Sequence, residues 1–196
     1  MLIGLTGNYG MGKSFVLSVF RELGAMVLDS DDIVHILLQE KSVIRDIKTI
    51  LGDRVEKKDG TLDKEVVAEI IFNNSILRNK LEVLLHPMVF DKIETYLQKI
   101  RGKRRLVIIE VPLLFEGAYE GRFDRTITVF STQKAALERL RKGGVSRSNA
   151  LKRLKAQLPI QIKKKKTDYQ IDNNGTKQRT RNQVESIYKR LVEEMP

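Results

Sequence analysis

Eight residues near the start of the chain, Gly7 to Ser14, match the pattern G-x-x-x-x-G-K-[ST] of a phosphate-binding loop. The glycines let successive backbone N–H groups turn toward one phosphate, the lysine adds a positive charge, and the serine hydroxyl can bind Mg²⁺. Such a loop needs a strand before it and a helix after it, because the helix N-terminus supplies further free N–H groups. Apolar residues 2–5 and the helical pattern of residues 15–23 provide this context. The sequence therefore predicts a nucleoside triphosphate site.

Short apolar strands alternate with helical segments along the rest of the chain. The expected strands are 2–6, 25–29, 105–110, 125–130 and 169–172. The expected helices are 12–23, 31–39, 43–51, 63–72, 75–85, 87–100, 133–142, 146–158 and 177–194, with Pro87 in the first turn of its helix. Strands joined by helical crossovers form a parallel sheet with helices on both faces. We therefore expect a doubly wound α/β fold of about five strands.

The net charge of +11 is concentrated in the last third of the chain. Residues 1–130 carry equal numbers of basic and acidic side chains, whereas every charged residue from Arg139 to Lys166 is basic. Such a block is typical of a solvated face, a nucleic-acid surface or a cationic lid over polyphosphate. The segment 139–168 contains no aromatic residue that could stack on a base, which favours the lid.

The composition excludes several classes of site and protein. The chain has no cysteine, and therefore no disulfide, thiolate metal site or cysteine nucleophile. No apolar run approaches the roughly 20 residues of a membrane-spanning helix, and the N-terminus does not resemble a signal peptide. We expect a soluble, cytoplasmic protein with a real hydrophobic core, since 41% of its 196 residues are hydrophobic.

Three further groups of residues have the chemistry of phosphoryl transfer. Asp29-Ser-Asp31-Asp32 ends the second strand, where a carboxylate can accept the proton of an acceptor hydroxyl or can simply cap the next helix. Glu110 ends an apolar strand and is suited either to a Mg²⁺-bound water or to solvent. His86 is one of two histidines, and a lone histidine is more often structural than catalytic.

Taken together, these motifs resemble the dephospho-coenzyme A kinase family nearly from end to end. Besides the phosphate loop, the resemblance rests on Asp29-Ser-Asp31, Asp59-Gly-Thr-Leu-Asp63, His86-Pro87, Pro112-Leu-Leu-Phe-Glu116, Arg153-x-x-x-Gln157-Leu-Pro159 and Asp168-Tyr-x-Ile-Asp-Asn173. The resemblance implies ATP-dependent phosphorylation of the ribose 3′-hydroxyl of dephospho-coenzyme A, with Mg²⁺. It also implies three parts: a nucleotide core (1–41, 101–142 and 167–196), a helical acceptor domain (42–100) and a lid (143–166).

The resemblance also implies a role for each matching residue. Asp31 would be the base, with Lys13 and Arg139 as the other catalytic residues. The ATP-binding residues would be Gly10, Met11, Gly12, Lys13, Ser14, Phe15, Arg139 and Asn173. The acceptor-binding residues would be Asp31, Lys64, His86, Pro87 and Glu116. Mg²⁺ would be held by Ser14 and, through water, by Glu110.

The sequence departs from the family pattern at several of these positions. Phe15 stands in place of threonine, Glu110 in place of aspartate, and Lys64 in place of arginine. Gly143 falls where a second lid arginine is expected. The neighbouring cations that could replace this arginine are Arg141, Lys142 and Arg147.

Two other functions are consistent with a phosphate loop. One is a nucleoside or nucleotide kinase of the same fold, and the other is a nucleic-acid-binding ATPase suggested by the positive charge. The leading hypothesis is a kinase that acts on small molecules, without a nucleic-acid or membrane partner, as a monomer or weak homo-oligomer.

Overall fold

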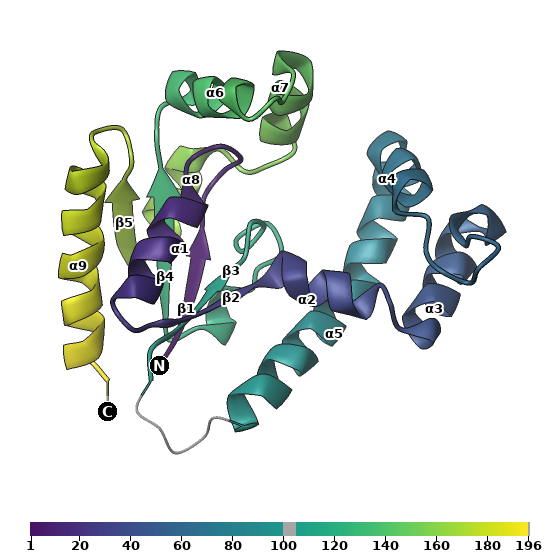
Figure 1. The fold of residues 1–196 in the computed structure, drawn as a ribbon, viewed down its shortest axis with the longest axis horizontal. Helices are drawn as coiled ribbons and strands as arrows, with labels where there is room; N and C mark the ends of the chain where they lie inside the picture. Colours follow the sequence, from purple (N-terminus) through teal and green to yellow (C-terminus); the bar gives the residue numbers. More distant parts are fainter. Residues whose placement is uncertain (100–104, 196) are drawn as a thin grey trace. The chain divides into compact units, whose positions relative to one another are not determined.

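The computed structural model describes residues 1–99 and 105–195, without the side chains of Asp31, Ser75 and Lys99 (Figure 1). The strands are β1 (Leu2–Thr6), β2 (Met26–Asp29), β3 (Val107–Glu110), β4 (Arg125–Phe130) and β5 (Tyr169–Asp172). The helices are α1 (Lys13–Glu22), α2 (Ser30–Leu37), α3 (Lys41–Leu51), α4 (Lys64–Asn73), α5 (Ser75–Lys99), α6 (Gln133–Lys142), α7 (Arg147–Lys155), α8 (Ile160–Lys166) and α9 (Lys177–Glu193), with 3-10 turns η1 (Asp53–Val55) and η2 (Glu120–Arg122).

The described strands form one parallel sheet in the order β2-β3-β1-β4-β5, which confirms the predicted α/β class. β1 is the central strand, and Ile3 and Leu5 within it are fully buried. Leu5 lies in register with Glu110, which in turn lies in register with Asp29. The phosphate loop, Glu110 and Asp29 therefore meet at the carboxyl edge of the sheet, where such folds bind ligands.

Helices α1 and α9 lie side by side against the sheet (Figure 1). Their apolar residues join the strands in one core, in which Phe20 of α1 and Val184 of α9 are fully buried. This core fixes the position of α1, and therefore the position of the phosphate loop at its N-terminus.

The chain divides into two compact units, each with a hydrophobic core of its own. The first unit contains residues 1–29 and the described chain from Arg105 onward, and the second runs from Ser30 to the end of α5. Helix α3 shows why the second unit folds: Val43, Ile47 and Leu51 recur at helical spacing and are buried in its core. This division groups α2 with the second unit, whereas the sequence analysis placed it in the nucleotide core. The functional roles of the parts stay predictions.

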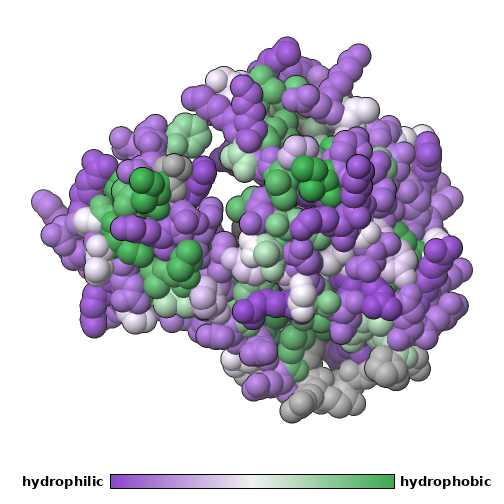
Figure 2. All heavy atoms as spheres, turned by 180° about the vertical axis from the view of Figure 1, so that it is seen from behind, coloured by the Kyte–Doolittle hydropathy of each residue, from purple (hydrophilic) through white to green (hydrophobic). Residues whose placement is uncertain are grey.

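Apolar side chains also reach the surface of the second unit (Figure 2). Phe72, Ile76 and Val83 have exposed fractions of 55%, 69% and 66%. None of the described helices combines the length and the apolar character needed to span a membrane.

One helix, α5, replaces the two helices that were predicted at 75–85 and 87–100, and residue 100 lies outside the described residues. Pro87 lies inside α5, so the prediction of a new helix at Pro87 was wrong. Proline removes one backbone N–H and leaves the carbonyl of Val83 without its helical partner. The apolar face nevertheless continues through the proline, since Leu85 and Val89 are both buried. Packing of this face outweighs the local cost.

The predicted helix 146–158 is shorter than expected. Helix α7 ends at Lys155, and a separate helix, α8, begins after Pro159. Proline at the N-cap cannot continue a preceding helix but is compatible with the start of a new one. Helix α8 packs against β4 and was missed by the sequence analysis.

Candidate functional site

The phosphate loop connects the end of β1 to the start of α1, as predicted. Gly10 and Gly12 have backbone φ angles of +78° and +88°, a conformation that favours glycine. A Cβ at Gly10 would lie 2.8 Å from the Leu140 side chain, and one at Gly12 would collide with the Asn173 side chain. Both glycines are therefore required for backbone conformation and for close packing.

Asn173, just after β5, holds the middle of the phosphate loop. Its Nδ2 donates to the Met11 carbonyl at 2.9 Å, and its Oδ1 accepts from the Thr180 hydroxyl at 3.0 Å. The side chain is almost completely buried. The structure thus brings Asn173 to the phosphate loop, with which the sequence analysis grouped it.

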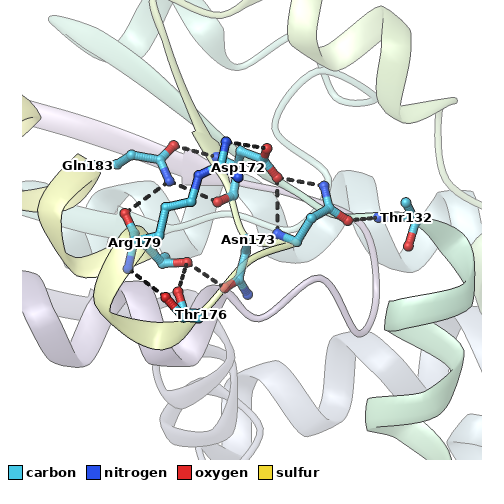
Figure 3. A network of polar contacts seen from close by, with 8 residues as sticks. Thr132, Asp172, Asn173, Thr176, Arg179 and Gln183 are labelled. Carbon is cyan, nitrogen blue, oxygen red and sulfur yellow. Dashed lines mark hydrogen bonds and ion pairs between the residues drawn. The ribbon is translucent and has the colours of Figure 1, made fainter.

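A network of polar contacts fixes the turn that carries Asn173 (Figure 3). Gln183 of α9 exchanges two hydrogen bonds with the backbone of Asp172, both at 2.9 Å. The carboxylate of Asp172 accepts from the Asn174 backbone at 3.0 Å, and Asn174 Oδ1 accepts from the Thr132 N–H at 2.6 Å. Because Thr132 is the N-cap of α6, this network joins β5, α9 and α6 around the loop.

Arg139 extends from α6 to the same loop. Its guanidinium donates to the Ser131 hydroxyl at 3.0 Å, to the Gly10 carbonyl at 3.5 Å and to the Asn173 carbonyl at 2.5 Å. These three acceptors are uncharged, so the bonds orient the guanidinium without neutralising it. A fixed positive charge beside a phosphate loop favours a polyphosphate.

Lys13 and Glu110 form an ion pair at 3.3 Å, with side chains only 10% and 12% exposed. Both residues were predicted site residues, and the structure brings them together at the carboxyl edge of the sheet. A bound phosphate would compete with Glu110 for the lysine.

The residues predicted to hold Mg²⁺ supply few protein ligands. Ser14 lies in the first turn of α1 and Glu110 at the end of β3. Among the side chains that the structure describes, which exclude that of Asp31, no three or more histidines, aspartates and glutamates form a group that could hold a metal ion. This set fits Mg²⁺, which usually keeps several waters and takes other oxygens from substrate phosphates.

The segment after α7 contacts the N-terminal half of the loop. Gln157 Oε1 accepts from the Tyr9 N–H at 2.8 Å, and the Leu158 carbonyl accepts from Asn8 Nδ2 at 3.0 Å. The Arg153 guanidinium carbon lies 4.9 Å from the centre of the Tyr9 ring, a cation–π distance. The motif Arg153-x-x-x-Gln157 therefore attaches the predicted lid to the loop.

The interpretation of Lys163–Lys166 as part of a cationic surface was wrong for Lys163. Lys163 is fully buried and pairs with Glu116 at 2.8 Å. Lys164 lies 3.8 Å from the centre of the Phe130 ring, and Lys166 pairs with Glu120 at 3.1 Å. Helix α8 turns only Lys163 toward the core, and a run of four lysines gives no sign of which one is buried.

The predicted acceptor residues fall in both units. Glu116 belongs to the first unit, whereas Lys64, His86 and Pro87 belong to the second. Burial lowers the pKa of His86, although the nearby Glu82 partly opposes this shift. The side chain of Asp31 lies outside the described part of the structure, so its role as base stays a prediction.

Comparisons with known proteins agree with one another. The family model described as dephospho-CoA kinase matches residues 1–179. The dephospho-CoA kinase of Aquifex aeolicus is 35% identical over 191 residues, which cover 97% of each chain. A dephospho-CoA kinase structure from Campylobacter jejuni has 26% identity and a TM-score of 0.72, covering 98% of this chain and 97% of its own. A Thermus thermophilus structure has 28% identity and a TM-score of 0.84, covering 100% and 98%.

Proposed function

The chain belongs to the dephospho-CoA kinase family, and from this premise we propose how its residues carry out the reaction. The enzyme transfers the γ-phosphoryl group of ATP to the ribose 3′-hydroxyl of dephospho-CoA, which gives CoA and ADP. The observation that carries this proposal is the glycine loop at the central strand, enclosed by Arg139 and Asn173.

ATP binds with its phosphates on the backbone N–H groups of Gly10 to Phe15. Lys13 exchanges its partner Glu110 for the β- and γ-phosphates, and the helix N-terminus beneath them adds a positive dipole. Arg139 stays oriented by its three oxygen acceptors and offsets the charge that develops on the transferred group. Asn173 keeps the loop in the conformation that presents these donors.

Ser14 and Glu110 are the residues that would hold Mg²⁺, the serine directly and the glutamate through water. The ion offsets negative charge on the β- and γ-phosphate oxygens when it is bound. Glu110 pairs with Lys13 in the empty loop, and it would contact the water shell of the ion in the loaded loop.

Asp31 orients the 3′-hydroxyl and accepts its proton as that oxygen attacks the γ-phosphorus in line with the leaving oxygen. Lys64, His86, Pro87 and Glu116 line the acceptor site. Closure of the lid over ATP excludes water and limits wasteful hydrolysis. Replacing Asp31 with Asn should lower turnover by orders of magnitude and leave the Kd for ATP unchanged. Near-normal turnover of that variant would contradict the assignment of the base.

The experiment that tests the function is a coupled ADP-release assay with Mg-ATP and four additions: dephospho-CoA, adenosine, AMP and duplex DNA. We expect turnover with dephospho-CoA alone. Faster turnover with adenosine or AMP would favour a nucleoside or nucleotide kinase. Stimulation by DNA that falls steeply with salt would favour the nucleic-acid-binding ATPase.

We further propose that the enzyme works in the cytoplasm as a monomer or weak homo-oligomer, without a nucleic-acid partner. ATP and dephospho-CoA are small soluble molecules, so the reaction itself requires no macromolecular partner. Sedimentation at several protein concentrations would measure the oligomeric state.

A further inference from the structure

Helix α8 carries a lysine whose charge is completely enclosed by the fold. Lys163 is 0% exposed, and its Nζ lies 2.8 Å from Glu116 Oε1. The same ammonium donates to the Pro112 carbonyl at 2.9 Å. Burial lowers the pKa of Lys163, while Glu116 opposes that shift and the nearby cation Lys13 adds to it. The positive charge of Lys13 is therefore close enough to that of Lys163 for the two to repel each other.

Glu116 uses one carboxylate oxygen for two contacts. Oε1 accepts from the Leu158 N–H at 2.9 Å in addition to its bond with Lys163. Oε2 is buried and has no hydrogen-bond partner among the described residues. The carboxylate thus faces the fold rather than solvent, and it holds the backbone at Leu158 by accepting its N–H.

The segment that Glu116 holds is the one that contacts the phosphate loop. Leu158 gives its N–H to Glu116 and receives the Asn8 side chain on its carbonyl. The preceding residue, Gln157, accepts the Tyr9 N–H. A continuous series of polar contacts therefore connects Lys163 to the loop through Glu116 and Leu158, and every distance in it lies between 2.8 and 3.0 Å.

We propose that Glu116 and Lys163 are a positioning pair that fixes residues 157 and 158 against the phosphate loop, and so sets the conformation of Asn8 and Tyr9 for ATP. The inference rests on the proposed function, since it assumes that ATP binds at this loop. It assigns Glu116 an action on the ATP side of the reaction, through Leu158, in addition to the acceptor side that the family resemblance implies.

Stability alone is a weak reason for such a pair. The cost of taking two charges out of water often exceeds their attraction, and buried ion pairs can be replaced by uncharged residues with little loss. Removing one partner, in contrast, leaves a buried charge without compensation. A double variant that removes both charges is therefore expected to fold, which separates positioning from folding.

The test compares Glu116→Met, which removes the acceptor of the Leu158 N–H, with Lys163→Met, the double variant and Lys165→Met. Lys165 is the matched control, because it belongs to the same helix and is exposed. For each folded variant we would measure the melting temperature, the Kd for ATP without acceptor, and the KM for each substrate. We expect the two single variants and the double variant to raise the Kd for ATP at least about fivefold, the lower end of typical coupling between two sites. Lys165→Met should leave it unchanged.

A further variant keeps the test decisive if the single variants do not fold. Gln157→Leu leaves the buried ion pair intact and removes only the acceptor of the Tyr9 N–H. We expect it to raise the Kd for ATP with an unchanged melting temperature.

Two outcomes would overturn the inference. One is an unchanged Kd for ATP in Gln157→Leu and in the double variant, together with normal wild-type kinase activity. The other is a rise confined to the KM for dephospho-CoA, which would make Glu116 an acceptor contact only. Failure of the wild-type protein to bind ATP or to phosphorylate dephospho-CoA would instead contradict the proposed function.

Discussion

Replacing Asn173 with alanine tests how the phosphate loop is held. The substitution removes the bond from Nδ2 to the Met11 carbonyl and the bond that Oδ1 accepts from Thr180. It leaves the Asn173 carbonyl, which binds Arg139, in place. The loop therefore loses one defined contact while the guanidinium keeps its acceptors.

The size of the effect follows from the burial of that contact. Leaving a buried acceptor unpaired costs about 1–3 kcal/mol. Arg139 still bonds to the Gly10 carbonyl and restrains the loop, so we expect the lower part of this range. If about 1–2 kcal/mol falls on the loop conformation that binds ATP, the Kd for ATP rises about 5- to 30-fold.

Isothermal titration with ATP and with inorganic tripolyphosphate distinguishes this effect from a direct contact between Asn173 and the adenine of ATP. Tripolyphosphate has no adenine, so both ligands should weaken by the same factor if Asn173 acts through the loop. Thr180→Val is the matched control, because it removes the other hydrogen bond of Asn173 and keeps the bond to Met11. The reasoning is refuted if Asn173→Ala changes the Kd for tripolyphosphate less than twofold, or if Thr180→Val changes it equally.

Three further predictions concern backbone conformation, a strand contact and pH. Gly10→Ala should lower the free energy of unfolding by about 1–2 kcal/mol from the left-handed backbone alone, and it should weaken ATP binding. Thermal melting and titration would show both effects against the control Gly121→Ala, where an added Cβ meets no atom within 4 Å. Asp168→Asn should lower the free energy of unfolding in urea by about 1 kcal/mol, because the carboxylate of Asp168 accepts from both the N–H and the hydroxyl of Thr126 at 2.7 and 2.8 Å. An unchanged midpoint of urea unfolding would contradict this. Burial lowers the pKa of His86, so the unfolded chain binds more protons just below pH 6.5 and stability should fall as the pH falls through that window; melting curves of His86→Gln should lose this part of the slope, and an equal slope in both proteins would argue against it.

The sequence predicted the parts of the site that depend on local pattern. The phosphate loop is recognisable because its glycines must adopt positive φ angles and its lysine must follow them directly. The strand before Asn173 was also predicted, at 169–172, and the structure confirms these bounds. These features depend on residues close together in sequence.

The features that the sequence did not predict depend on packing between distant segments. Pro87 signals a helix start locally, but the buried face from Leu81 to Ile93 keeps α5 continuous. Lys163 is the first of four consecutive lysines, and it differs from the other three in its buried ion pair with the distant Glu116. A single sequence contains no signal that pairs these two residues.

The position of β1 at the centre of the sheet has a consequence for biosynthesis. The ribosome makes β1 first, yet its two neighbours, β3 and β4, emerge only after the whole second unit. The second unit has its own core and can condense while Ile3 and Leu5 are still exposed to water. The phosphate loop then gains its support from Asn173 only after β5 has been made. The nascent chain is therefore open to aggregation and chaperone capture until β3 and β4 cover the central strand, and ATP can stabilise the fold only after Asn173 has been made.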